Sequence, residues 1–142
     1  MVVVCEGYYC RVLAVDEDVA NLELIRDALH SYDCGYDVTI CSNQIQALHM
    51  LHRHKVEIDL IMATINHDTG LMFLELIKHM TDAPVLAMST VWSDGLISKA
   101  TRGGVFFILE KPIDECNLHW VFVEFPRAYF ISLDEKRKRS AS

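Results

Sequence analysis

Apolar runs of strand length alternate with amphipathic stretches along the chain. The predicted strands lie in CRVLAV (10–15), which is apolar throughout, in CGYDVTIC (34–41), which supplies a Gly turn and a second strand, and in IDLIMA (58–63), VLAMS (85–89) and VFFIL (105–109). Continuous apolar runs of this length are typical of strands that are buried on both faces. Elsewhere the apolar residues recur at helical spacing, which predicts helices over about 19–31, 44–54, 71–80, 94–102 and 115–125.

The first three predicted helices each have one apolar face. The residues expected to point into the core are Leu22, Ile25 and Leu29 in the first helix, Ile45, Leu48 and Leu51 in the second, and Leu74 and Ile77 in the third. Asn43 precedes the second helix and belongs to the residue types that cap helix N-termini. Gly103 and Gly104 end the fourth helix, and Pro126 ends the fifth.

Five strands that alternate with helices indicate βαβ units and therefore a mainly parallel sheet. The predicted class is α/β: a flavodoxin-like, doubly wound, five-stranded sheet in the order 2-1-3-4-5, with helices on both faces. In such folds the functional crevice lies beyond the carboxyl ends of the strands. The residues at the strand ends are therefore the first candidates for chemistry.

Polar side chains stand at four of these strand ends. Asp16 and Glu17 follow the first strand, Thr64 the third, Ser89 the fourth, and Lys111 the fifth. Oxygen ligands suit Mg²⁺, and a lysine can neutralise phosphoryl oxygens, so the set resembles the remnant of a metal and phosphoryl site. The alternative is that acids and hydroxyls merely end the strands as turn residues.

Amino-acid composition and net charge argue against several classes of function. The net charge of −7 over 142 residues argues against general nucleic-acid binding, which needs a basic surface. Apolar runs fall short of the roughly 20 residues of a membrane span. Five cysteines with irregular spacing favour reduced thiols over disulfides or a zinc site; they are Cys5, Cys10, Cys34, Cys41 and Cys116. His49 and His52 lie one turn apart, and we expect a solvated helix face there rather than a metal site.

Several segments together resemble the receiver domain of response regulators, above all those of plant two-component systems. They are RVLAVDED, CGYDVTICSNQIQAL, DLIMATIN, PVLAMS and LEKPID, and the resemblance runs from about residue 11 to 125. It implies three segments: an N-terminal extension (1–9), a receiver-like domain (10–126) and a C-terminal tail (127–142). An unrelated flavodoxin-like enzyme or flavin binder fits less well, because the acidic end of the first strand would repel a cofactor phosphate.

The resemblance assigns a role to each polar strand end. In the family an acidic pair binds Mg²⁺, and the matching residues are Asp16 and Glu17. Ser89 matches the hydroxyl that contacts the phosphoryl group, and Lys111 the lysine that does the same. The bond between Lys111 and Pro112 is expected to be cis, a form that is accessible chiefly before proline.

The family's phosphoacceptor aspartate has no counterpart here. Thr64 matches that position, and an ungapped alignment anchored on Gly70 places Met62 there instead. Asp68 is the nearest acid, several residues past the strand end, and it is the alternative acceptor. The switch aromatic of the family is replaced by Ile108. These departures predict a pseudo-receiver that has lost its phosphoacceptor.

The predicted function is a non-enzymatic interaction module that acts without phosphorylation. No cofactor is expected, although Asp16 and Glu17 could hold Mg²⁺ weakly. The resemblance implies signalling partners: histidine phosphotransfer proteins, other response regulators or transcription factors, in plant cytokinin signalling and transcription regulation. The alternative is a phosphorelay receiver that accepts phosphate at Asp68 or Thr64.

The C-terminal region carries two further predictions. The last predicted helix is apolar nearly all round, through Leu118, Trp120, Val121, Phe122, Val123 and Phe125. We expect it to pack on the segment RAYFISL or on another chain, in a homodimer through the face formed by the fourth helix, fifth strand and fifth helix. The basic cluster from Lys136 to Arg139 is either a solvated tail or a nuclear import signal, so the expected location is the nucleus or the cytoplasm.

Overall fold

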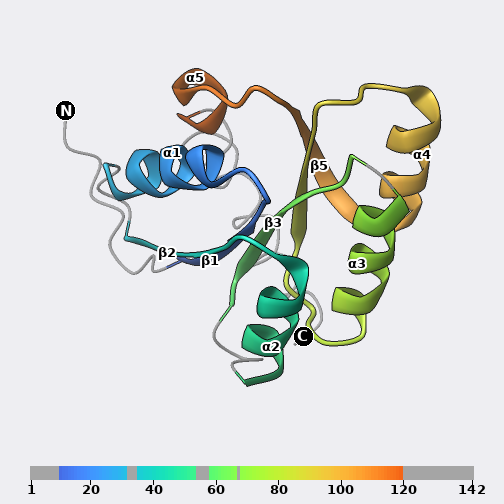
Figure 1. Ribbon diagram of the computed structural model, residues 1–142, viewed down its shortest axis with the longest axis horizontal. Coiled ribbons are helices and arrows are strands. Elements are labelled where there is room, and N and C mark those ends of the chain that lie inside the picture. The colour runs from blue at the N-terminus through green and yellow to red at the C-terminus, as the bar shows by residue number, and fades with distance from the viewer. Residues whose placement is uncertain (1–9, 32–34, 54–57, 67, 120–142) are drawn as a thin grey trace, which may run out of the picture.

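The computed structural model of the chain describes residues 10–31, 35–53, 58–66 and 68–119. Strands and helices alternate throughout (Figure 1). The strands are β1 (Cys10–Val15), β2 (Tyr36–Cys41), β3 (Leu60–Thr64), β4 (Val85–Ser89) and β5 (Val105–Glu110). The helices are α1 (Val19–His30), α2 (Gln44–Arg53), α3 (Asp68–Lys78), α4 (Asp94–Arg102) and α5 (Glu115–His119).

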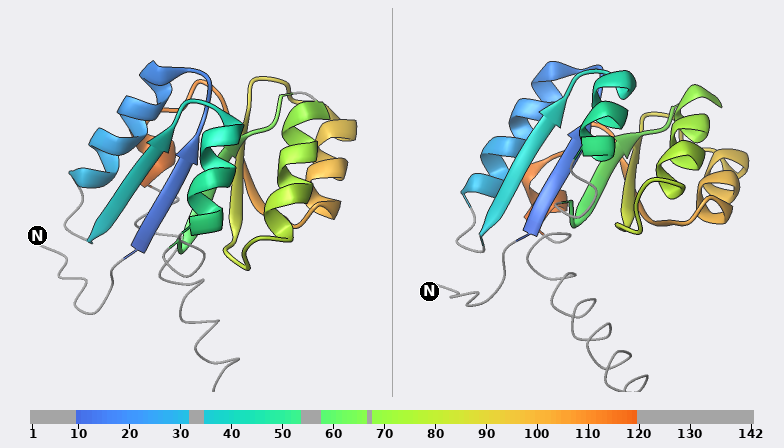
Figure 2. Two further views of the ribbon diagram at one scale, coloured as in Figure 1. Left: turned by 60° about the horizontal axis from the view of Figure 1, so that its bottom comes forward. Right: turned by 90° about the horizontal axis from the view of Figure 1, so that it is seen from below.

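The strands form one parallel sheet in the order β2-β1-β3-β4-β5, as predicted. Helices α1 and α5 cover one face, and α2, α3 and α4 cover the other (Figure 2). All carboxyl ends of the strands therefore lie at the same edge of the sheet. This edge is where the sequence places the candidate site.

Strand β1 lies inside the sheet, between β2 and β3, and contributes side chains to both halves of the core. Val12 and Ala14 pack in the cluster under α1, whereas Leu13 and Val15 pack in the cluster under α2 and α3. All four side chains are at most 4% exposed. Successive residues of a strand point to opposite faces, so a strand covered on both sides has no polar alternation. This explains why the run CRVLAV is apolar throughout.

The predicted inward faces of α1 and α3 are confirmed, because the named leucines and isoleucines of these helices are at most 3% exposed. The prediction for α2 is wrong at Ile45, which is 70% exposed. Ala47 and Leu51 form the buried face of this helix, and Leu48 packs beside them. The small side chain of Ala47 lets the helix approach the sheet, which turns Ile45 outward.

Several smaller expectations can also be compared with the structure. Asn43 caps α2, since its side-chain oxygen accepts a hydrogen bond from the backbone N–H of Gln46 at 2.7 Å. Helix α3 begins at Asp68, three residues before the predicted start. The cysteines in the described ranges, at positions 10, 41 and 116, are free thiols. Cys5 and Cys34 lie outside the described residues.

Other expectations concern the surface and the C-terminal region. His49 and His52 are exposed, as expected for a solvated helix face. Within the described ranges, no helix is long and apolar enough to cross a membrane. The predicted continuation of the last helix beyond His119, with its apolar side chains and the basic tail, lies outside the described residues.

Candidate functional site

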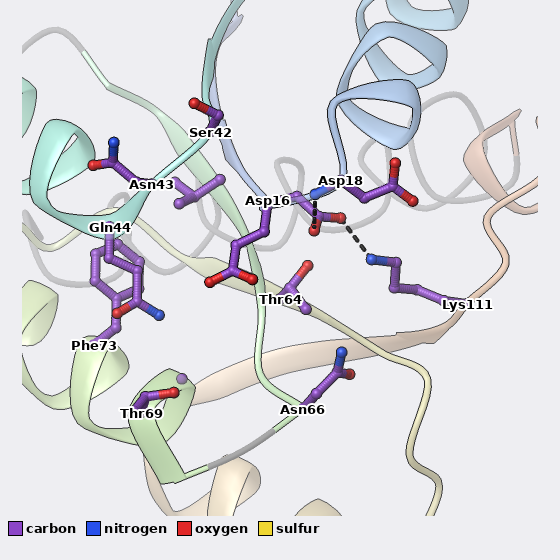
Figure 3. A pocket seen from close by; sticks show the side chains of 13 residues that line it. Asp16, Asp18, Ser42, Asn43, Gln44, Thr64, Asn66, Thr69, Phe73 and Lys111 are labelled. Carbon is purple, nitrogen blue, oxygen red and sulfur yellow. Dashed lines mark hydrogen bonds and ion pairs between the residues drawn. The ribbon is translucent and has the colours of Figure 1, made fainter.

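A cavity of about 260 Å³ opens at the carboxyl edge of the sheet, between the ends of β1 and β3 and the starts of α2 and α3 (Figure 3). Of the five polar strand-end residues predicted from the sequence, four line this cavity and one lies beside it. Asp16, Glu17, Thr64 and Lys111 line the cavity. Ser89 is fully buried beside it and is not among the described lining residues.

Asp16 is the best-connected side chain of the site. Its Oδ2 accepts hydrogen bonds from Lys111 Nζ at 2.7 Å and from Asn21 Nδ2 at 2.7 Å. Its Oδ1 accepts one from the backbone N–H of Asp18 at 3.0 Å. The side chains of Asp16 and Lys111 are 3% and 9% exposed, so this is a buried ion pair with additional hydrogen bonds.

Burial and hydrogen bonding act in opposite directions on this carboxyl group. Burial, the largest single influence, raises the pKa of Asp16, but the hydrogen bonds and the charge of Lys111 together bring the pKa below its ordinary value. Asp16 is therefore ionised at neutral pH, and its negative charge is balanced by Lys111. The predicted cis bond between Lys111 and Pro112 is present.

Thr64 ends β3 and faces the cavity near the Asp16–Lys111 pair (Figure 3). Its Oγ1 is buried and has no hydrogen-bond partner. Met62, the other residue considered for the acceptor position, is fully buried in the core under α1. Thr64 is therefore the residue that the strand presents to the site.

The loop after β3 is short because α3 starts close to the strand end. A Cβ atom on Gly70 would lie 2.6 Å from Ile65 Cα and 3.0 Å from the carbonyl oxygen of Thr64. Only glycine allows so close an approach. Asp68, the alternative acceptor, occupies the first position of α3, and its side chain lies outside the described residues.

Ser89 and Asn66 join the loops that follow β3 and β4. Asn66 Oδ1 accepts a hydrogen bond from the backbone N–H of Thr90 at 2.8 Å and lies 3.1 Å from Ser89 Oγ. Ser89 Oγ also accepts a hydrogen bond from the N–H of Val91 at 3.0 Å. The hydroxyl is thus engaged away from Thr64. Sequence reasoning missed Asn66, whose only signal is a polar side chain two residues past a strand end.

Ile108, which the resemblance predicts to replace the family's switch aromatic, is a half-buried residue of β5 paired with Ala87 in the sheet. It packs against the core cluster under α2, α3 and α4. In this structure it acts as an ordinary core residue.

The residues of the cavity fit a Mg²⁺ ion poorly. This ion requires near-octahedral oxygen ligands, usually including ionised carboxylates. The carboxylate of Asp16 is already occupied by Lys111 and Asn21, and Thr64 offers a neutral hydroxyl. Across the described residues, no group of three or more His, Cys, Asp or Glu side chains is placed to hold a metal.

The fold and the site define a receiver-type α/β domain: a parallel sheet in this order, with an acidic pair and a lysine at one edge. The chain belongs to the response regulator receiver domain family, whose model matches residues 12–122. This match lies inside the predicted receiver-like segment.

Curated relatives include plant response regulators. The chain is 31% identical over 105 residues to the two-component response regulator ORR21 of rice, covering 72% of this chain and 15% of that protein. It is 33% identical over 114 residues to the putative two-component response regulator-like APRR4 of Arabidopsis thaliana, covering 79% and 38%. The chain thus spans less than two thirds of the length of these relatives.

Solved structures confirm the fold. A response regulator from Thermotoga maritima superposes with a TM-score of 0.72 at 22% identity, covering 84% of this chain and 96% of that one. A CheY-like receiver domain from Methanospirillum hungatei superposes with a TM-score of 0.69 at 20% identity, covering 92% and 98%. The flavodoxin-like, CheY-like class predicted from the sequence is therefore correct.

Proposed function

We propose that the chain is a pseudo-receiver, a receiver domain of a two-component response regulator that acts without phosphorylation of the β3 end. The supporting observation is Thr64, which takes the place of an acceptor carboxylate beside the Asp16–Lys111 pair. In receiver chemistry the acceptor must be an ionised carboxylate, because it is both the nucleophile and a metal ligand. A threonine hydroxyl supplies neither property at neutral pH.

Asp16 is a poor base for activating Thr64. A hydroxyl becomes a good nucleophile only when a neighbouring group takes its proton. Asp16 lines the same cavity, but its pKa lies below its ordinary value: burial raises it, and three hydrogen-bond donors and the charge of Lys111 outweigh the effect of burial. A carboxylate with so low a pKa is a weak general base.

The corresponding role is that of a non-enzymatic interaction module. The module binds signalling proteins such as histidine phosphotransfer proteins, other response regulators or transcription factors, without contacting nucleic acid directly. The plant relatives support a place in plant two-component signalling, including cytokinin responses and transcription regulation, in the nucleus or the cytoplasm. The homodimer through the α4–β5–α5 face belongs to the same proposal.

Phosphodonor labelling tests this function. The protein is incubated with acetyl phosphate and Mg²⁺, and its intact mass is measured. The proposal expects the mass to stay unchanged. A stoichiometric gain of one phosphoryl group would contradict it.

A second candidate is a phosphorelay receiver that accepts phosphate at Asp68 or Thr64. The retained Asp16 and Lys111 favour it, because in receivers these residue types surround the acceptor. Phosphotransfer from a histidine phosphotransfer protein would support this candidate if Asp68→Asn or Thr64→Val abolished it. Absence of any transfer to the wild-type chain would exclude it.

A further inference from the structure

The cavity carries an excess of negative charge. Among the described residues, its ionisable lining side chains are three carboxylates (Asp16, Glu17 and Asp18) and one ammonium (Lys111), which gives these residues a net charge of −2. The ammonium of Lys111 is already paired with Asp16, with Nζ 2.7 Å from Oδ2. The side chains of Glu17 and Asp18 are exposed and face no cation that the structure records among the described lining residues. A cation from outside the chain would therefore be attracted to this cavity.

A neutral acceptor completes the cavity. Thr64 Oγ1 is buried without a hydrogen-bond partner, which is unfavourable for a polar atom. Asn66 also lines the cavity, but its side-chain carbonyl oxygen already accepts a hydrogen bond from the backbone N–H of Thr90 at 2.8 Å. The cavity volume of about 260 Å³ exceeds the roughly 30 Å³ of one water several times. A side-chain head group with several donors would fit and would satisfy the Thr64 hydroxyl oxygen.

An apolar anchor lies next to the cavity. Asn66 Oδ1 accepts a hydrogen bond from the backbone N–H of Thr90 at 2.8 Å, and Ser89 Oγ accepts one from the N–H of Val91 at 3.0 Å. The next residue, Trp92, is 53% exposed, and Val91 is 42% exposed. Tryptophan is among the residue types most enriched at the energetic centres of protein interfaces. The hydrogen bonds thus fix a loop that offers two large apolar side chains to solvent.

The edge around the anchor is acidic. Beyond the carboxyl ends of the strands, the exposed charged side chains of the described chain are all carboxylates: Glu17, Asp18, Asp94, Glu110, Asp114 and Glu115. Charge complementarity therefore selects a basic partner surface over an acidic one. An exposed tryptophan within an acidic rim fits a segment that combines cationic and apolar residues.

We propose that this edge docks a basic, partly apolar segment of a partner protein, with an arginine of that segment inserted into the cavity. The inference rests on the proposed pseudo-receiver function, since it gives the altered site a ligand in place of a metal ion. A guanidinium group has five donors in a planar fork and binds carboxylates and neutral oxygens together. It can pair with Glu17 and Thr64 without displacing Lys111 from Asp16. A Mg²⁺ ion at Asp16 would compete with Lys111 and Asn21 for Oδ2 and with the backbone N–H of Asp18 for Oδ1.

A peptide titration tests the inference on the full chain. The probe is a short fluorescein-labelled peptide with two arginines and two leucines, and its binding is followed by fluorescence anisotropy. Its matched control carries citrulline, which is neutral but has the same shape, at both arginine positions. The arginine peptide is expected to bind at least about tenfold more tightly, as for a charge-assisted hydrogen bond of 1.5–3 kcal/mol.

Variants of the protein locate the site. Glu17→Gln and Trp92→Ala are each expected to weaken binding about tenfold, and Thr64→Val about threefold or more. Asp82→Asn is the matched control, because Asp82 is an exposed acid that follows α3 at the opposite edge of the sheet. It is expected to change binding less than twofold. All four changes affect exposed side chains or keep the side-chain shape, so the fold is retained.

Three results would overturn the inference: equal affinity for the two peptides, equal losses in Asp82→Asn and Glu17→Gln, or displacement of the peptide by millimolar Mg²⁺. The last result would make the cavity a metal site. Failure here is distinct from failure of the proposed function, because the latter is measured by phosphodonor labelling. A protein that binds no peptide and takes no phosphoryl group would remain a pseudo-receiver with a different partner surface.

Discussion

Lys111 Nζ lies 2.7 Å from Asp16 Oδ2, across the carboxyl edge of the sheet. The two residues are 95 positions apart in the sequence, and both side chains are at most 9% exposed. The lysine that follows β5 is therefore bound to the first of the two acids that follow β1. This ion pair balances the negative charge of Asp16 and links the end of β1 to the end of β5.

Removal of Lys111 is expected to destabilise the fold. Lys111→Met leaves the carboxylate of Asp16 buried without its cation, which typically costs about 3–5 kcal/mol of unfolding free energy. The measurement is urea denaturation at neutral pH. Lys99→Met is the control, because Lys99 is exposed on α4 and should change the unfolding free energy by less than about 0.5 kcal/mol.

A double variant distinguishes the loss of the whole ion pair from the loss of one charged group. Lys111→Met with Asp16→Asn removes both charges together, so it is expected to be more stable than Lys111→Met alone. Equal stability of the two variants would show that Asp16 is not ionised against Lys111.

The stability of the protein is expected to depend on pH through Asp16. Burial raises the pKa of Asp16, but the hydrogen bonds from Lys111, Asp18 N–H and Asn21 outweigh this effect and bring the pKa below the ordinary value of 3.8. A group with a lowered folded-state pKa stabilises the fold above its unfolded-state pKa, and this contribution is lost as the pH falls through the folded-state pKa. The unfolding free energies of wild type and Asp16→Asn should therefore differ most above about pH 4 and converge in more acidic solution. A difference that stays constant from neutral to acidic pH would contradict this prediction.

Gly70 is expected to tolerate no side chain. In Gly70→Ala the new Cβ would lie 2.6 Å from Ile65 Cα, so the start of α3 must move away from the end of β3. We expect a loss of about 1–3 kcal/mol in the unfolding free energy, as for overpacked sites. The matched control is Gly95→Ala in the first turn of α4, where nothing lies within 4 Å of the new Cβ. Because alanine favours helix, that variant should be stabilised by up to about 1 kcal/mol.

The fold could be predicted from the sequence because every strand is short and separated from the next by a helix, and all except β2 are mainly apolar. Strand β1 shows this most clearly, since Val12 and Leu13 point to opposite faces and are both fully buried. The error at Ile45 has a physical origin. Hydrophobicity ranks isoleucine above alanine, but Ala47 fits against the sheet because it is small, and the buried face of α2 follows Ala47.

The candidate site could be predicted only in part. The convergence of Asp16, Thr64 and Lys111 follows from strand order, because parallel strands bring their carboxyl ends to one edge. The partners within the site do not follow from strand order. Asn66 binds the loop after β4, and Thr64 Oγ1 stays without a partner; both depend on the path of short loops.

Removal of the Thr64 hydroxyl should stabilise the protein. Thr64→Val keeps the shape of the side chain and deletes a buried polar atom that has no partner. A buried polar atom without a partner destabilises the folded state, so its removal is expected to raise the unfolding free energy by up to about 1 kcal/mol. Denaturation of wild type and variant under the same conditions measures it. A loss of stability would show that the hydroxyl is satisfied in solution, for example by water.

Under the proposed function, Thr64→Asp should give the site the acceptor carboxylate that receiver chemistry needs. Thr64→Asp places a third acid beside Asp16 and Glu17, which supplies both a nucleophile and a hard oxygen ligand. Because like charges repel, the variant should be less stable than wild type without metal and should be stabilised by millimolar Mg²⁺ in a thermal shift assay. With acetyl phosphate, attack by the new carboxylate on phosphorus would release acetate and leave one phosphoryl group on the protein, visible as a stoichiometric gain in intact mass. Thr64→Asn, which has the same shape without the charge, should show neither effect. If Thr64→Asp gained no phosphoryl group, the site would have lost more than its acceptor, and the position of Lys111 against Asp16 would be the first feature to examine.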